Sequence, residues 1–138
     1  MPAIYHHHHQ VIASEIDELH HANNASYVNW MQAAAIAHST AQGWPSERYW
    51  DASVAWVARS HKIDYVQPAF EGDALIIRTW VADMQRVSSL RKYEIMRASD
   101  DTLLARAETR WAFVRLDTRK PTRIPADVQA DFEIVSGH

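Results

Sequence analysis

The stretch Asp17-Glu-Leu-His-His-Ala-Asn-Asn-Ala-Ser-Tyr27 places two acids, two histidines and two amide side chains directly before a long run of helix-forming residues. Asn23 or Asn24 is a candidate N-cap for that helix. The N–H groups of a first helical turn have no partner within the helix and lie at the positive end of its dipole. We therefore expect them to point toward the loop that carries Asp17. A carboxylate beside such donors suits acyl transfer, in which N–H groups stabilise an oxyanion.

The residues that follow predict one long helix from residue 25 to residue 42, ended by Gly43 and Pro45. Its apolar sector is wide and rich in alanine, which favours close approach to several strands over a narrow surface stripe. We therefore expect a sheet to enclose the helix.

The rest of the chain is dominated by segments with the composition of β-strands, separated by short polar turns. Residues 4–14 predict a first strand. Four long antiparallel strands are predicted at 53–67, 74–87, 88–98 and 102–116. Residues 119–125 predict an extended segment, followed by a short helix over 126–132 that has Pro125 at its first position. The fold class expected from this order is α+β.

Composition narrows the functional classes. The chain has 138 residues, of which 47 % are hydrophobic, so we expect a single domain over residues 1–138. A net charge of −3 without a basic stripe argues against nucleic acid as a partner, and no apolar run approaches the roughly 18 residues of a membrane span. The sequence has no cysteine and no secretory signal pattern, which makes the cytoplasm the expected location.

Four consecutive histidines, His6 to His9, raise the question of a metal site. In a strand, consecutive side chains point to opposite faces. The chain has no H-E-x-x-H motif and no cysteine to complete a tetrahedral set of ligands. We expect no metal site here.

The residues Asp17-x-x-His-His21-x-Asn-Asn24-x-x-Tyr27-x-x-Trp30 resemble the loop-and-helix signature of the 4-hydroxybenzoyl-CoA thioesterase-like acyl-CoA thioesterases. Pro68-Ala-Phe-Glu-Gly-Asp73 and the region from Arg86 to Ile95 are also similar to that family, so the resemblance covers residues 5 to 125. It implies a hotdog fold, in which a five-stranded antiparallel sheet wraps a long central helix. His20 is a departure, because the family usually has glycine before the histidine; histidine tolerates positive φ better than most side chains.

The resemblance also implies chemistry for three residues. Asp17 would attack the thioester carbonyl, or activate a water that does. The backbone N–H that polarises the carbonyl oxygen would belong to Asn24 or a neighbour, and Asn24 is itself most simply interpreted as the helix cap. His21 would either orient Asp17 or the water, or hydrogen-bond to the backbone of the loop. Hydrolysis of an acyl-CoA by these groups requires no cofactor.

Substrate contacts are expected at two places. Tyr27 is expected in the core or in the lining of an acyl pocket. CoA phosphates need cations near the mouth of the site, and the local basicity suggests Arg86 and Arg91, beside Ser88 and Ser89.

Members of the family form dimers with their sheets side by side and the acyl site at the interface, often pairing further into tetramers. Long bare edge strands independently favour such pairing, so we expect a homodimer or a tetramer made of two dimers. Two alternatives stay open: a hotdog protein that binds acyl-CoA without catalysis, and a hotdog hydratase or dehydratase. The second ranks lower, because the G-D-x-N-P-x-H type of loop is absent.

Overall fold

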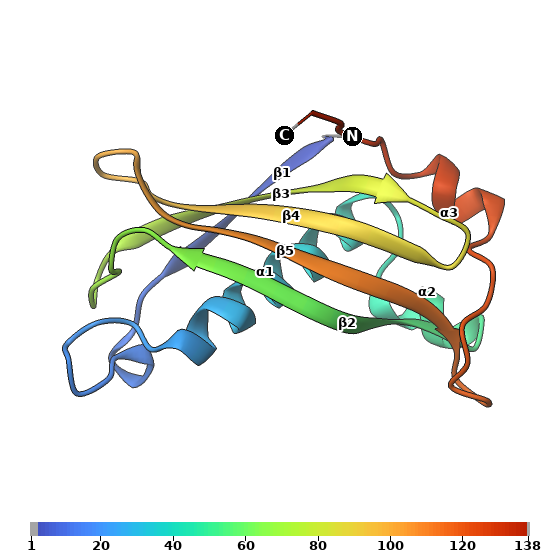
Figure 1. Ribbon diagram of the computed structural model, residues 1–138, viewed down its shortest axis with the longest axis horizontal. Coiled ribbons are helices and arrows are strands. Elements are labelled where there is room, and N and C mark those ends of the chain that lie inside the picture. The colour runs from blue at the N-terminus through green and yellow to red at the C-terminus, as the bar shows by residue number, and fades with distance from the viewer. Residues whose placement is uncertain (1–2, 138) are drawn as a thin grey trace.

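The computed structural model describes residues 3–137, in which a five-stranded antiparallel sheet curves around one long helix (Figure 1). Along the chain the elements are β1 (Ile4–Gln10), a 3₁₀ turn (Ala13–Glu15), α1 (Asn24–Ala41), α2 (Ser46–Asp51), β2 (Val54–Tyr65), β3 (Ala74–Met84), β4 (Ser88–Arg97), β5 (Thr102–Arg115) and α3 (Ala126–Ala130). The strands lie in the order β1-β3-β4-β5-β2, so β1 and β2 form the two edges. The expected α+β class and the central helix are confirmed.

Three local predictions were wrong. The first strand ends at Gln10, because the Glu15 carboxylate accepts a hydrogen bond of 3.0 Å from the Ile12 N–H and turns the chain into the 3₁₀ segment. Helix α2 was not predicted, since its six residues are too few to show a helical period. Pro125 is the N-cap residue of α3 and lies just before its first helical position.

The strands present alternate residues to the helix. On β3 alternate side chains, those of Leu75, Ile77, Thr79 and Val81, are buried. Most of the inward residues of the central strands form one core with the buried face of α1. On α1 that face consists of Ser26, Tyr27, Trp30, Met31, Ala34, Ala35 and His38. Ala34 is fully buried, and its small side chain lets the helix approach the strands closely.

The two ends of α1 have different surroundings. The loop before the helix lies at one end, and α2 and α3 lie at the other (Figure 1). A second apolar cluster fills this far end, where Trp44 and Tyr49 pack with Phe113 and with Val128 and Phe132. None of the helices in residues 3–137 is both long and apolar enough to cross a membrane.

Candidate active site

The Asp17 loop is closed by short-range hydrogen bonds. Oδ1 of Asp17 accepts from the N–H of Leu19 at 2.9 Å and from the N–H of His21 at 3.4 Å. The Asp17 N–H donates to the His21 carbonyl at 2.8 Å. Between them His20 has φ 63°, the left-handed conformation that glycine adopts without strain. The carboxylate is thereby held on the outside of a tight turn, and Oδ2 takes no part in these bonds.

The loop leads directly into the first turn of α1. Ile16 and Ala22 form an antiparallel bridge, and the Asn23 N–H donates to the Glu15 carbonyl at 2.7 Å. Asn23 is the N-cap, because its Oδ1 accepts from the Ser26 N–H at 2.8 Å. The interpretation of Asn24 as the cap was therefore wrong, and Asn24 is the first helical residue. This position leaves the Asn24 and Ala25 N–H groups without an acceptor among residues 3–137.

His21 packs through its ring and makes no side-chain hydrogen bond to Asp17. The ring lies edge-on to Phe70, with centroids 5.5 Å apart. Its link to Asp17 runs through the backbone alone. The geometry therefore matches backbone support of the loop, the second of the two roles expected for His21.

Glu15 is a carboxylate beneath the loop whose part the sequence did not reveal. Its side chain is 15 % exposed and accepts from Trp30 Nε1 at 2.7 Å, and it lies 2.9 Å from His9 Nε2. Burial by itself raises the pKa of the Glu15 carboxyl, but the hydrogen bonds from His9, the Ile12 N–H and Trp30 outweigh it and hold that pKa below its ordinary value. Glu15 thus ties β1, the 3₁₀ turn and α1 together behind Asp17.

Tyr27 belongs to the core at this same end of the helix. It is 2 % exposed and packs against Trp30 and, edge-on, against Tyr65 at the end of β2, with ring centroids 5.0 Å apart. Among the two settings expected for Tyr27, the structure places it in the core.

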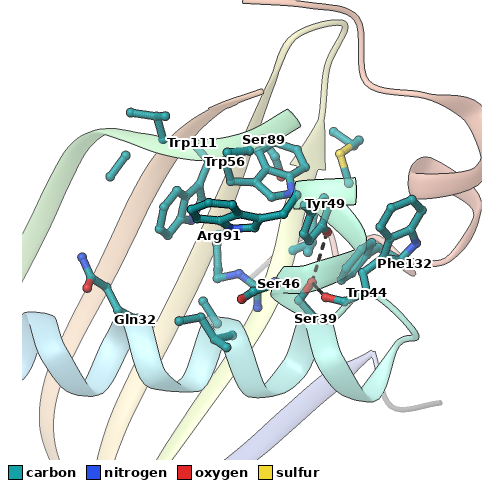
Figure 2. A pocket seen from close by; sticks show the side chains of 18 residues that line it. Gln32, Ser39, Trp44, Ser46, Tyr49, Trp56, Ser89, Arg91, Trp111 and Phe132 are labelled. Carbon is teal, nitrogen blue, oxygen red and sulfur yellow. Dashed lines mark hydrogen bonds between the residues drawn. The ribbon is translucent and has the colours of Figure 1, made fainter. Parts of the chain in front are cut away.

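The main cavity lies elsewhere, along the second half of α1 (Figure 2). It has a volume of about 460 Å³ and is lined by α1, α2, the start of β2 and the adjacent ends of β3, β4 and β5. Six of the residues in its walls are aromatic: Trp44, Tyr49, Trp50, Trp56, Trp111 and Phe132. Asp17, His21, Asn24 and Tyr27 are not among its lining residues. At 1.5 Å per residue, the first residue of α1 lies about 22 Å from Ser39 in the cavity wall.

The residues expected to contact CoA differ in their burial. Arg86 is exposed in the turn between β3 and β4, and Ser88 is half-buried at the start of β4. Ser89 is buried in the cavity wall and donates to the Asp83 carbonyl at 2.8 Å. Arg91 is 6 % exposed, so its assignment as a surface cation near phosphates was wrong.

Arg91 belongs to a buried polar group below the aromatic walls. Its Nη1 donates to His38 Nδ1 at 2.9 Å and to Thr79 Oγ1 at 3.1 Å. Burial lowers the pKa of the Arg91 guanidinium, which nonetheless stays protonated, as guanidinium groups do in proteins. The signal for this placement is in the sequence: Ser89, Arg91, Tyr93 and Ile95 alternate along β4 on the side that faces the helix.

The four histidines of the run, His6 to His9, alternate between the two faces of β1. His6 and His8 are exposed, whereas His7 and His9 point inward. No group of three or more histidines, aspartates or glutamates within residues 3–137 is arranged to hold a metal ion.

Comparisons with known proteins agree with this architecture. The family model of the thioesterase-like superfamily matches residues 11–132. The chain is 31 % identical over 78 residues to the chloroplastic oleoyl-acyl carrier protein thioesterase of Coriandrum sativum, an alignment that covers 56 % of this chain and 21 % of that protein. It therefore spans only a minor part of that curated relative.

Two solved structures illustrate the fold. A 1,4-dihydroxy-2-naphthoyl-CoA thioesterase from Synechocystis superposes with a TM-score of 0.85 at 21 % identity, covering 93 % of this chain and 94 % of the other. A DHNA-CoA thioesterase from Staphylococcus aureus gives a TM-score of 0.83 at 20 % identity, covering 87 % and 80 %. With the sheet order and the family match over most of its length, the chain belongs to the thioesterase-like superfamily and has its hotdog fold.

Proposed function

We propose that the protein hydrolyses acyl-CoA thioesters, with Asp17 as general base or nucleophile and the first amides of α1 as the oxyanion hole. The observation that carries this proposal is the pair of N–H groups at Asn24 and Ala25 that have no acceptor among residues 3–137, next to the loop that holds the exposed carboxylate of Asp17. The N–H groups of a first helical turn point out of the helix end, and the helix dipole adds to their attraction for an oxyanion.

The chemistry needs few groups. In the water-mediated form, Asp17 accepts a proton from a water whose oxygen bonds to the carbonyl carbon, and the carbonyl oxygen becomes an oxyanion that the α1 amides stabilise. The C–S bond then breaks, and CoA departs as a thiolate. A thiolate is a good leaving group, so no strong general acid is required. In the covalent form, Asp17 attacks first and water hydrolyses the resulting anhydride.

Pairing of two chains through β2 would bring the Asp17 loop of one chain close to the cavity of the other. The cavity lies at the start of β2, near Ala55 to Ala58, whereas Tyr65 at its end contacts Tyr27 in the first part of α1. In an antiparallel pair of β2 strands, the start of one strand lies beside the end of the other. The Asp17 loop of each protomer would then face the cavity of its partner. Such a homodimer would also cover the bare β2 edge, on which Val57 and Tyr65 are each 48 % exposed.

The CoA part of the substrate is assigned to the solvent-exposed surface of this dimer. Arg86 remains a candidate contact for its phosphates, together with the adjacent Ser88, because both are reachable from solvent. Ser89 and Arg91 are instead assigned to the acyl group, since they line the cavity. Tyr27 would support the helix end from below.

The test is thiol release from a panel of aromatic and straight-chain acyl-CoAs, with the chain's lack of cysteine giving no protein background. Asp17→Asn is the informative variant, because the amide oxygen can still accept from the Leu19 N–H and preserve the turn. We expect its kcat/KM to fall by about 10²-fold or more. Glu18→Gln, which removes the neighbouring exposed carboxylate, is the matched control and should retain activity.

Equal loss in both variants, or release that is indifferent to Asp17, would refute the assignment of Asp17. Absence of release from every acyl-CoA would instead favour acyl-CoA binding without catalysis. The same acyl groups attached to acyl carrier protein instead of CoA would show which of the two carriers the enzyme prefers. This comparison is relevant because the curated relative from Coriandrum sativum is named as a thioesterase of an acyl carrier protein.

A further inference from the structure

Arg91 is the one charged residue among the described residues that line the cavity beside α1, most of which are apolar. Arg91 rises from the inward face of β4, and Figure 2 shows it between the helix and the tryptophans. Charged side chains are almost never buried unless an opposite charge accompanies them. The positive charge of the Arg91 guanidinium therefore needs a partner of opposite charge.

Among residues 3–137, the groups that accept from Arg91 are neutral. A guanidinium can only donate, so His38 accepts through Nδ1 and carries its proton on Nε2. Thr79 Oγ1 accepts from the same Arg91 nitrogen, and its hydroxyl donates to the Lys92 carbonyl at 3.0 Å. Both bonds involve Nη1, and neither Nε nor Nη2 of Arg91 donates to a residue in the described range 3–137.

Carboxylates in this region are engaged elsewhere. Asp83 pairs with Arg110 at 3.1 Å and also accepts from the Leu90 N–H. Asp131 accepts from Trp44 Nε1 at 2.8 Å. None of the ion pairs formed within residues 3–137 includes Arg91. The guanidinium is thus a buried cation without a counterion among residues 3–137, and its two remaining nitrogens donate to none of these residues.

We propose that Arg91 binds an anionic oxygen at the far end of the acyl group, so that the enzyme prefers acyl-CoAs whose acyl portion ends in a carboxylate. The proposal rests on the proposed function and specifies its substrate class. An arginine fork matches a carboxylate in a two-point contact, and a desolvated pair of this kind is strong. The CoA phosphates are poor candidates for this contact, because they are heavily hydrated and the cavity is walled by tryptophan and phenylalanine.

The size of the cavity agrees with this class. A volume of about 460 Å³ falls in the range of small-molecule sites and accommodates an acyl group of moderate size. The aromatic walls would contact the carbon chain or a ring, and Arg91 would supply the polar group that fixes orientation. A methyl-ended chain would leave the cation buried and unpaired, which is the physical basis of the expected discrimination.

The first experiment compares adipoyl-CoA with hexanoyl-CoA, which have the same chain length but end in a carboxylate and a methyl group. We expect kcat/KM of the wild-type protein to favour adipoyl-CoA by at least about 10-fold. Arg91→Met should abolish or reverse this ratio, and Arg91→Lys should give an intermediate value. Arg78→Met is the matched control, since Arg78 lies on the outer face and pairs with Glu94; it should keep the wild-type ratio.

A binding experiment separates this proposal from the thioesterase proposal. Quenching of tryptophan fluorescence should show that monomethyl adipate binds more tightly than methyl hexanoate, with the difference lost in Arg91→Met. Hydrolysis with no preference for the carboxylate, or a preference that survives in Arg91→Met, would overturn the role of Arg91 and leave the thioesterase intact. Arg91-dependent binding of monomethyl adipate without hydrolysis of any acyl-CoA would support this site and refute catalysis. Replacing a buried ion by an apolar residue is often neutral for stability, and the Lys variant gives a second measurement if the Met variant does not fold.

Discussion

The two ends of helix α1 carry different kinds of chemistry, built in different ways. At the N-terminal end, Asp17, His21 and Asn23 lie within one short loop, and the hydrogen bonds that the side chains of Asp17 and Asn23 accept from the backbone join residues at most four positions apart. At the other end, Arg91 meets His38 and Thr79 from three different elements, under walls supplied by others. A local motif can be identified from sequence because the chain itself holds its parts together. A cavity formed by tertiary convergence has no such local pattern.

The largest effect is expected in a test of whether the Asp17 loop of one subunit and the cavity of the other form a shared active site. Asp17→Asn disables the loop, and Ala35→Phe fills the cavity from α1, where Ala35 is 8 % exposed. We expect each variant alone to lose about 10²-fold or more of the activity. Mixed and allowed to exchange subunits, they should recover about a quarter of the wild-type rate, because half of the dimers are mixed and each holds one intact site.

Recovery would show that the loop of one chain serves the cavity of another. If the mixture stayed as inactive as its components, although labelled subunits demonstrably exchanged, the site would be contained within one chain. Light scattering on both variants gives the oligomeric state needed to interpret either result. A mixture of Asp17→Asn with wild-type protein, treated in the same way, gives the reference activity for subunit exchange.

The next effect concerns the support beneath the loop. Glu15→Gln removes the charge that strengthens the hydrogen bonds from Trp30 and His9, so we expect a loss of about 1–2 kcal/mol in the free energy of unfolding at neutral pH. The pKa of Glu15 is lower in the folded state than in the unfolded chain. Its contribution is therefore present above the unfolded value and is lost as the pH falls through the folded value.

Thermal melting between neutral and acidic pH measures this dependence. The wild-type Tm should fall more steeply with acidification than that of Glu15→Gln, and the two curves should converge at low pH. Asp127→Asn serves as a control for the general loss of a carboxylate. Parallel curves for wild type and Glu15→Gln would contradict the role assigned to Glu15.

The sequence predicted the framework and one half of the candidate site. Helix α1 was predicted within one residue at each end, since its length, its alanines and the following Gly43 and Pro45 all agree. The enclosure of this helix by a sheet was also predicted, from the wide, alanine-rich apolar sector of the helix. The family resemblance led to the Asp17 loop, whose roles in catalysis remain proposals.

The errors share one physical cause. Arg91 was assigned to the CoA phosphates from local basicity alone, and only its register with Tyr93 and Ile95 reveals that it faces inward. Glu15 acts through His9 and Trp30, which approach it from β1 and α1. Tertiary partners decided these side chains, and their spacing along the chain carries little information about such partners.

The smallest expected effect isolates the one departure of the loop from the family pattern. His20 has φ 63°, which costs a residue with a Cβ about 1 kcal/mol relative to glycine. Glycine gains freedom in the unfolded chain, which offsets part of that gain. We therefore expect His20→Gly to raise the free energy of unfolding by about 0.5 kcal/mol, and His20→Val to lower it by about 1 kcal/mol or more. Urea unfolding resolves the sign of both changes. If His20→Gly instead destabilised the protein, the His20 side chain would have to make stabilising contacts in the assembled protein that outweigh the strain of its backbone. The histidine at this position would then have a role beyond adopting a positive φ.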